Sequence, residues 1–268
     1  MIGDLVWSQL AGRRTVILDL DGVVYRGTEA MPGAADAVAR LRMAGYRIGY
    51  LTNNSGAEPV QLVEKLRAFG IPCEPSELMT SGLGAAILLS QERARCGNLG
   101  VHVLGTPQLR ALVAAHGVRV TENHDVEILL VGLDVAFDYE TLALSVDTIL
   151  RGARIWACNR DANFPAAHGR ILPGCGPIVA ALETASGRRA EVVVGKPERV
   201  LLDLLLAQLG EPVDSCLVIG DGIDSDVAMA QSCGVPAVWV TEAVGDRGVV
   251  AVTSLAEFAD RILGATSS

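Results

Sequence analysis

The sequence predicts an α/β protein with a parallel β-sheet. Short apolar, β-branched runs alternate with segments whose apolar residues recur at helical spacing. Such alternation is typical of right-handed crossovers between parallel strands. Several of the runs end abruptly in polar clusters, as buried strands do where they reach the edge of a sheet. The 268 residues, 50% of them hydrophobic, suffice for one large domain or two of ordinary size.

The amino-terminal part is predicted to hold two strand–helix units. The first is a strand at 15–18, followed by a helix that Pro32 opens and Gly45 closes. The second is a strand at 46–51, followed by a helix at 58–69 whose apolar residues share one face. Two such units in succession predict the start of a parallel sheet.

The rest of the chain continues the alternation. The expected elements are, in chain order, strand 101–104, helix 107–116, strand 128–131, helix 138–151, strand 154–157, helix 177–186, strand 192–194, helix 199–209, strand 216–219, a helix ending at Cys233, strand 237–240 and a last helix. The last helix opens with the capping box Ser254-Leu255-Ala256-Glu257. Residues 158–176, rich in Asn, Asp, Pro and Gly, are predicted to be a loop whose length favours a functional role.

Composition and charge exclude several classes of function. The net charge of −9 and the 4% aromatic content disfavour binding to nucleic acid. No apolar run approaches the ~18 residues of a membrane span, and residues 1–4 lack the basic region of a signal peptide. The six cysteines form no CxxC pair and no metal-binding spacing, which is typical of buried, reduced thiols. We therefore expect a cytoplasmic protein that binds neither nucleic acid nor membranes.

Four of the predicted strands end in polar clusters, at residues 19–22, 52–55, 195–197 and 220–226. The carboxyl ends of strands in an open parallel sheet lie along one edge, where ligands bind. Segments far apart in the sequence can therefore meet in one site. The groups expected to meet there are Asp19, Asp21, Thr52, Asn53, Asn54, Lys196, Asp221, Asp224 and Asp226.

These groups favour a magnesium ion and a phosphoryl ligand. Clustered carboxylates repel one another and raise each other's pKa unless a cation lies among them. Oxygen ligands without His or Cys select a hard ion, above all Mg²⁺. A lysine, a hydroxyl and amides beside the metal are suited to hold phosphate oxygens. Lys196 is one of only two lysines in the chain, the other being Lys65, which favours a chemical role for it.

Each cluster also has a structural explanation. The acids of 19–22 could be turn residues, 52–55 is a typical turn sequence, and Lys196 could be a surface lysine. Asp224 and Asp226 could cap the following helix. Function is favoured because all four clusters end predicted strands of one sheet, so that several levels of organisation agree.

The four clusters, in this order, resemble the four motifs of the haloacid dehalogenase superfamily of phosphatases. They are DLDGVVYRG (19–27), LTNNS (51–55), VVGKP (193–197) and GDGIDSDVAMA (220–230). The insertion between the second and third motifs resembles the large α/β cap of the subgroup that includes pyridoxal-phosphate, phosphoglycolate, glycerol-phosphate and p-nitrophenyl phosphatases. Within it, 158–176 resembles that subgroup's cap loop. The likeness extends from about residue 13 to residue 260.

The resemblance implies a two-part architecture and a reaction. A doubly wound, Rossmann-like parallel-sheet core would comprise 1–97 and 190–268, and a smaller inserted α/β cap would comprise 98–189. The reaction would be Mg²⁺-dependent hydrolysis of a small phosphomonoester through an aspartyl-phosphate. The partner would be a small phosphorylated metabolite, and a homodimer formed through the cap is compatible with this subgroup.

The resemblance also implies a role for each matching residue. Asp19 would be the nucleophile, and Asp21 would be the general acid and base. The metal would be held by Asp19, Asp21 through its backbone carbonyl, Asp221, and Asp226 directly or through the outer shell. The phosphate would be bound by Thr52, Asn53, Asn54 and Lys196. Phe164 stands where pyridoxal-phosphate phosphatases carry a histidine and would stack against the rest of the substrate. The alternative is that it packs to anchor the loop, as aromatic side chains more often do.

The substrate itself is left open, since glycerol phosphate, phosphoglycolate, pyridoxal phosphate and nucleoside monophosphates all fit. After LTNNS the family continues with Ser or Thr and a basic residue, whereas this chain has Gly56-Ala57-Glu58. No role is assigned to Asp224 or to the cap-loop residues Asn159, Asp161 and His168. Two alternatives belong to other classes: a phospho-acceptor signalling domain, which is typically shorter and has no cap, and a non-catalytic protein that binds a phosphorylated metabolite.

Overall fold

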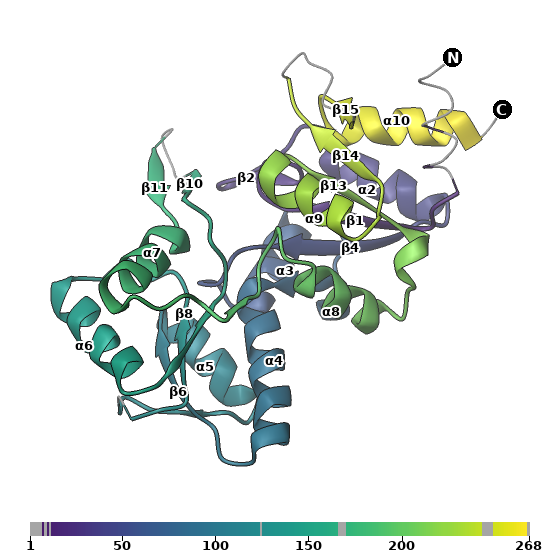
Figure 1. Ribbon diagram of the computed structural model, residues 1–268. Coiled ribbons are helices and arrows are strands. Elements are labelled where there is room, and N and C mark those ends of the chain that lie inside the picture. Colours follow the sequence, from purple (N-terminus) through teal and green to yellow (C-terminus); the bar gives the residue numbers. More distant parts are fainter. Residues whose placement is uncertain are drawn as a thin grey trace. The chain divides into compact units, whose positions relative to one another are not determined.

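The computed structural model describes residues 7, 10, 12–123, 125–165, 170–242 and 249–266 (Figure 1). The chain divides into two compact units. Unit 1 comprises Met1–Thr52, Val60–Met79 and Leu201–Ser268, and unit 2 comprises Asn53–Pro59 and Thr80–Val200. The assignment of a catalytic core and a cap to the ranges given above stays a prediction. Among the described residues, no helix is both long enough and apolar enough to cross a bilayer.

Unit 1 is built on a six-stranded sheet with the strand order β15-β14-β13-β1-β4-β5. Its strands are β1 (Thr15–Asp19), β4 (Arg47–Thr52), β5 (Leu78–Thr80), β13 (Cys216–Gly220), β14 (Ala237–Val240) and β15 (Val250–Val252). Numbered along the chain, this is the order 6-5-4-1-2-3 of a doubly wound, Rossmann-like sheet. Two short antiparallel strands, β2 (Tyr25–Arg26) and β3 (Glu29–Ala30), follow β1.

Strand β1 lies in the middle of this sheet, where the strand order reverses. It pairs in parallel with β13 on one side and with β4 on the other. All five of its residues are buried, which explains an apolar run without alternation. The crevice beyond the carboxyl ends of the strands at such a switch point is where doubly wound sheets bind ligands. Strands β1 and β13 end there, at Asp19 and Gly220.

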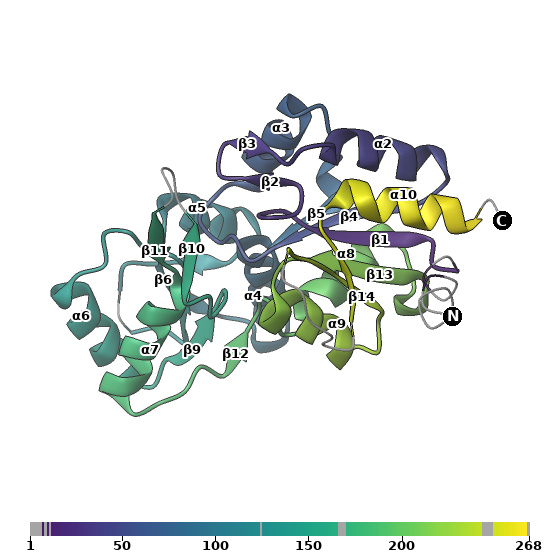
Figure 2. The ribbon, with the colours of Figure 1, turned by 90° about the horizontal axis from the view of Figure 1, so that it is seen from above.

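Helices cover both faces of the sheet in unit 1. Three lie on one face, namely α2 (Ala34–Met43), α3 (Pro59–Ala68) and α10 (Leu255–Thr266), whereas α8 (Val200–Leu209) and α9 (Ala228–Ser232) lie on the other (Figures 1 and 2). A π-helical turn, Ile223–Val227, precedes α9, and two 3-10 turns lie at Pro75–Glu77 and Val213–Ser215.

Only half of the capping box predicted at the start of α10 is present. The Glu257 backbone N–H donates to Ser254 Oγ (3.2 Å), as predicted. The Glu257 carboxylate, however, accepts from the backbone N–H of Thr253 instead of that of Ser254.

Unit 2 has a second parallel sheet, with the order β12-β9-β8-β6-β7. Its strands are β6 (Gly100–Leu104), β7 (Arg119–Val120), β8 (Ile128–Val131), β9 (Arg154–Ala157) and β12 (Val192–Val193), and its helices are α4 (Ser81–Cys96), α5 (Pro107–Ala115), α6 (Tyr139–Leu150) and α7 (Cys175–Ser186). Leu129, Ile155 and Leu182 belong to the core beneath α6 and α7. The crossover from β6 to β7 through α5 runs along the sheet in the direction opposite to the crossovers through α6 and α7. Because all of these crossovers are right-handed, α5 lies on the face of the sheet opposite to α6 and α7.

The predicted fold class is confirmed, with corrections at the level of individual elements. Residues 158–176 are not a loop throughout, because they contain the antiparallel pair β10 (Asn163–Pro165) and β11 (Ile171–Pro173) and the start of α7. Strands of three residues that include prolines are too short to show a period. Helix α4 and the short strands β2, β3, β5, β7 and β15 were not predicted. His168, for which no role was predicted, lies outside the described residues.

Candidate active site

Three carboxylates gather at the switch point of the sheet in unit 1. Asp19, Asp221 and Asp226 each offer one oxygen, and these oxygens lie within 4.8 Å of one another. Asp19 and Asp226 are buried, with exposed fractions of 8% and 2%, whereas Asp221 is exposed. Like charges this close are stabilised by a divalent cation, and a donor set made only of oxygens favours a hard one. We call these three residues the carboxylate cluster.

Glycines allow close approaches between and within the two motifs that supply this cluster. Gly22 has φ +85°, and a Cβ on it would lie 2.0 Å from Asp221 Oδ2. Likewise, a Cβ on Gly220 would lie 2.2 Å from the Cβ of Asp226. Neither contact tolerates a side chain, and the positive φ at Gly22 also disfavours one. The glycines of DLDG and GDG are therefore part of the geometry that brings the carboxylates together.

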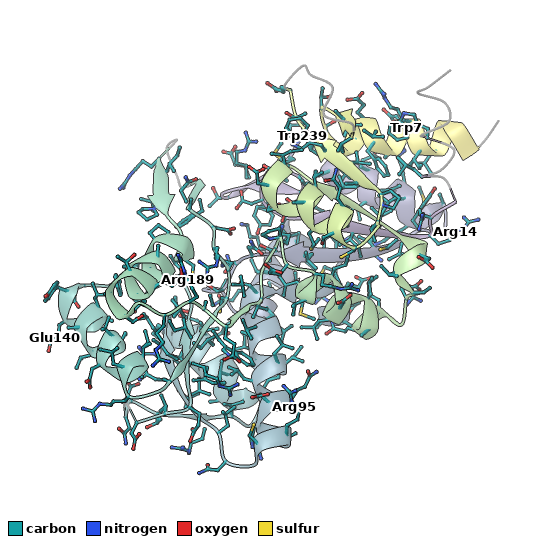
Figure 3. The ribbon with its side chains drawn as sticks, in the orientation of Figure 1. Trp7, Arg14, Arg95, Glu140, Arg189 and Trp239 are labelled. Atoms are coloured by element: carbon teal, nitrogen blue, oxygen red, sulfur yellow. The ribbon has the colours of Figure 1, made fainter. Side chains whose placement is uncertain are left out.

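Hydrogen bonds hold the acids that follow β13. Trp239 on β14 (Figure 3) donates from Nε1 to the backbone oxygen of Asp221 (2.9 Å). Asp226 Oδ2 accepts from the backbone N–H of Gly222 and from Ser225 Oγ, both at 3.2 Å. Asp226 lies inside the π-helical turn rather than at its N-cap, which is Gly222, so the alternative that it caps the next helix is wrong. Asp224, on the same turn, is exposed.

Asp21 has properties suited to a general acid. Its Oδ1 is buried and has no hydrogen-bond partner in the part of the chain that the structure describes. Burial raises the pKa of this carboxyl, and the positive charge of Lys65 and the backbone N–H of Gly27 offset part of that rise. A carboxyl whose pKa is raised holds its proton at a higher pH and can deliver it to a leaving oxygen.

A second cluster lies in unit 2 and is made of hydrogen bonds around the backbone of a lysine. Asn53 Oδ1 accepts from the backbone N–H of Lys196 (2.8 Å), and Asn53 Nδ2 donates to the backbone oxygen of the same residue (3.1 Å) and to Asp161 Oδ1 (2.8 Å). The backbone oxygen of Asn53 accepts from Ser81 Oγ and Asn159 Nδ2 (2.6 and 2.7 Å). We call Asn53, Lys196, Asp161, Asn159 and Ser81 the amide–lysine cluster.

This arrangement changes what the Asn53 side chain can do. Both hydrogens of its carboxamide are already donated within the protein, so the side chain holds the backbone of Lys196 rather than offering a donor to a phosphate. Lys196 itself is 4% exposed, and a Cβ on the preceding Gly195 would lie 2.6 Å from Asn53 Oδ1. Asp161 and Asn159 had no predicted role, and their sequence signal was only their place in the 158–176 segment.

The other predicted phosphate and substrate residues lie as follows. Thr52 is buried at the end of β4, in unit 1. Asn54 is exposed, and its Oδ1 accepts from the backbone N–H groups of Gly56 and Ala57, both at 2.9 Å, which is typical of a turn residue. Phe164 lies on β10 and lines a mainly apolar cavity of about 380 Å³ in unit 2, together with Leu133, Asp134, Val135, Phe137, Leu172, Pro173, Gly174, Pro177 and Ile178.

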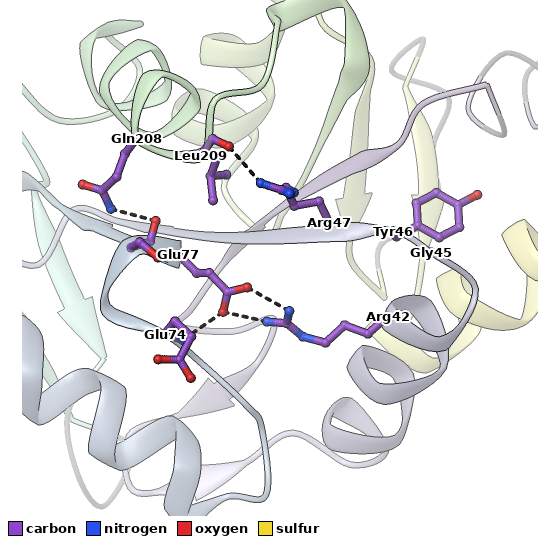
Figure 4. A pocket seen from close by; sticks show the side chains of 9 residues that line it. Arg42, Gly45, Tyr46, Arg47, Glu74, Glu77, Gln208 and Leu209 are labelled. Atoms are coloured by element: carbon purple, nitrogen blue, oxygen red, sulfur yellow. Dashed lines mark hydrogen bonds and ion pairs between the residues drawn. The ribbon is translucent and has the colours of Figure 1, made fainter.

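Another cavity of about 460 Å³ lies in unit 1, near the amino end of β4 (Figure 4). The polar groups around it bind one another: Arg42 pairs with both oxygens of Glu77, and Arg47 Nη1 donates to the backbone oxygen of Leu209 (2.9 Å). Catalytic groups in a doubly wound sheet lie at the carboxyl ends of the strands. This cavity is therefore not the candidate active site.

Comparison with known proteins identifies relatives over most of the chain. Residues 16–119 match a model described as haloacid dehalogenase-like hydrolase, and 193–262 match a HAD-hydrolase-like model. The chain is 34% identical over 254 residues to glycerol-3-phosphate phosphatase of Gallus gallus, covering 87% of this chain and 80% of the relative.

Solved structures are similar over nearly the whole chain. A p-nitrophenyl phosphatase from Archaeoglobus fulgidus has a TM-score of 0.85 and 30% identity, with 92% of this chain and 98% of that chain covered. A glycerol phosphate phosphatase from Mycobacterium tuberculosis in complex with calcium has a TM-score of 0.78 and 29% identity, with coverages of 90% and 69%.

Proposed function

The chain belongs to the haloacid dehalogenase-like hydrolases and is a phosphatase of small phosphorylated substrates, and from this premise we propose a Mg²⁺-dependent mechanism through an aspartyl-phosphate. The observation that carries the proposal is the carboxylate cluster at the switch point of the sheet, because three carboxylate oxygens within 4.8 Å of one another suit a hard divalent ion. Asp19, Asp221 and Asp226 would hold that ion, with the backbone oxygen of Asp21. When bound, it would neutralise charge on the phosphate oxygens.

In the first half-reaction, a carboxylate oxygen of Asp19 attacks phosphorus while the bond between phosphorus and the substrate oxygen breaks. The carboxyl proton of Asp21 passes to the departing oxygen, so the product leaves as an alcohol. The raised pKa of Asp21 supports this role, since it favours the protonated form.

In the second half-reaction, water replaces the alcohol. Asp21, now a carboxylate, takes a proton from water as the water oxygen attacks phosphorus. The bond between phosphorus and Asp19 breaks, inorganic phosphate leaves, and both carboxyl groups return to their starting states. One residue serves first as acid and then as base, so the proton balance closes over the cycle.

We assign phosphate binding to Lys196, Thr52 and Asn54, and we assign the orientation of Lys196 to the carboxamide of Asn53. A buried ammonium group is a strong partner for phosphate oxygens because little solvent screens it. Phe164 and the apolar cavity that it lines would receive a carbon-rich part of the substrate. The cytoplasmic location and the homodimer through the cap stay predictions.

Phosphate release tests the proposal directly. The purified protein is incubated with a panel of small phosphomonoesters, including glycerol phosphate, phosphoglycolate, pyridoxal phosphate, a sugar phosphate and p-nitrophenyl phosphate, with Mg²⁺ and again with EDTA. We expect release that requires Mg²⁺ and is abolished in Asp19→Asn. Residual activity of Asp19→Asn within tenfold of the wild type would contradict the nucleophile assignment, and release undiminished by EDTA would contradict the metal.

A further inference from the structure

Lys65, the second of the two lysines in the chain, has no part in the mechanism above. It lies half-buried on α3, and its Nζ donates to the backbone oxygen of Gly27 at 2.6 Å. The same Nζ lies 3.4 Å from the centroid of the Tyr25 ring, which itself packs against Phe69 with ring centroids 6.1 Å apart. The ammonium group is thus fixed by two different interactions, one with a carbonyl and one with an aromatic face.

Both of these contacts fall on the turn that carries Asp21. The backbone N–H of Gly22 donates to the oxygen of Tyr25 (2.7 Å), and Asp21 forms an isolated bridge with Tyr25, so residues 21–25 fold back on themselves. Gly27 has φ +56° and presents its two backbone groups to different partners. Its oxygen accepts from Lys65, and its backbone N–H lowers the pKa of the Asp21 carboxyl. Gly27 therefore links the ammonium group to the carboxyl.

A purely structural role would not require this geometry. Desolvation lowers the pKa of Lys65, so the charged form is held at a cost that an apolar side chain would not carry. The helix offers a comparison in Arg67, which also donates to a backbone carbonyl, from Nε to Cys73 (3.0 Å), but on a segment without catalytic groups. A charged donor directed at the Asp21 turn suggests that the position of Asp21 is what the contact controls.

We propose that Lys65 is a positioning residue that holds the 21–27 turn, and with it Asp21, in the geometry for proton transfer to the leaving oxygen. The inference rests on the proposed function, because it needs Asp21 as the general acid. Its consequence depends on the leaving group. The leaving group of an alkyl phosphate is an alkoxide, which needs a proton as it departs. The leaving group of p-nitrophenyl phosphate, p-nitrophenolate, is stable without one. Loss of Lys65 should therefore impair the first substrate class far more than the second.

The test measures kcat/KM, which reports the first half-reaction, for glycerol phosphate and for p-nitrophenyl phosphate. For Lys65→Met we expect about a tenfold or larger loss with glycerol phosphate and less than about a threefold loss with p-nitrophenyl phosphate. Lys65→Arg keeps a charged donor and should recover most of the activity. Asp21→Asn should show the same selectivity with a larger loss, and Arg67→Met, the matched control on α3, should change neither value.

Equal losses on both substrates would overturn the inference, since a role in folding alone does not distinguish leaving groups. No loss on either substrate would overturn it as well. If Lys65→Met does not fold, Lys65→Gln makes the same comparison. If the wild-type protein releases phosphate from neither substrate, the proposed function itself fails, and that outcome is separate because no variant is needed to see it.

Discussion

The carboxylate cluster of unit 1 and the amide–lysine cluster of unit 2 are built on opposite principles. The first gathers three like charges, at the ends of β1 and just beyond β13, with oxygens within 4.8 Å of one another. The second surrounds one buried lysine with a neutral carboxamide whose donors and acceptor all have partners in the chain. The first calls for a cation to relieve repulsion, whereas the second is held by hydrogen bonds that the protein supplies itself.

This difference predicts which property, metal binding or phosphate binding, a substitution in each cluster impairs. A change that moves a carboxylate by a fraction of an ångström should cost metal binding, because a metal site depends on the positions of all its ligands. A change in the amide–lysine cluster should leave the metal in place and weaken the binding of phosphate. Variants that separate these two outcomes therefore test the comparison itself.

Gly22→Ala should give the largest effect. The added Cβ would meet Asp221 Oδ2 at 2.0 Å, so the carboxylate must move. We expect kcat/KM to fall by about 100-fold or more, with weaker Mg²⁺ binding. Gly45→Ala is the matched control, because Gly45 has φ +88° and nothing within 4 Å of its Cβ. Both variants carry the strain of a left-handed alanine, about 1–2 kcal/mol, and only Gly22→Ala should lose the metal. Equal activity losses would show that backbone strain, not the cluster, is responsible.

Asn53→Ala tests the other cluster. It leaves the backbone N–H and oxygen of Lys196 without their partner. We expect KM and the inhibition constant of inorganic phosphate to rise about 10–100-fold, by analogy with groups that orient a ligand without touching it, while Mg²⁺ binding stays as in the wild type. Asp161→Ala should act in the same direction more weakly, and Asp161→Asn, which keeps an acceptor for Asn53 Nδ2, should restore activity. Asn123→Ala, an exposed amide in unit 2, serves as the control.

The two clusters also differ in how far the sequence predicted them. Asp19 ends β1, and Asp221 and Asp226 come after β13. Because strand ends meet at one edge of a parallel sheet, their proximity was predictable. The bond between Asn53 and Asp161 joins residues 108 positions apart, and nothing in spacing or composition pairs them. Helix α4 was missed because two glycines open it, and one of them, Gly82, allows an approach that tertiary packing requires: its Cβ would lie 3.1 Å from the Ser55 backbone oxygen.

Thermal unfolding with and without Mg²⁺ sharpens the contrast between a cluster that needs a ligand and one that does not. An ion present at about 100 times its dissociation constant adds about 2.7 kcal/mol of stability. We expect Mg²⁺ to raise the melting temperature of the wild-type protein and of Asn53→Ala by similar amounts. Asp221→Asn should show no such rise. A rise that survives in Asp221→Asn would mean that the ion binds elsewhere.

The smallest expected effect concerns an acid in unit 2 whose charge the protein itself neutralises. Glu183 is buried on α7, and Arg160, the backbone N–H of Ala190 and Arg189 (Figure 3) lower its pKa to about 2 from an ordinary 4.5. Because the folded-state pKa is depressed, this carboxylate contributes stability that is complete above pH 4.5 and is lost as the pH falls towards 2. We expect Glu183→Gln to lower the free energy of unfolding at pH 7 by about 2 kcal/mol and to flatten its decline below pH 4.5.

Glu140→Gln, an exposed acid on α6 (Figure 3), is the control and should leave the decline unchanged. This prediction also tests the comparison of the two clusters. Glu183 forms an ion pair with Arg160, which lies between Asn159 and Asp161 of the amide–lysine cluster. If that ion pair also orients the loop, phosphate inhibition should weaken in Glu183→Gln at pH 7, where the wild-type carboxylate is charged. An unchanged inhibition constant together with lower stability would confine Glu183 to folding, and would leave the hydrogen bonds of Asn53 as the means by which unit 2 positions its lysine.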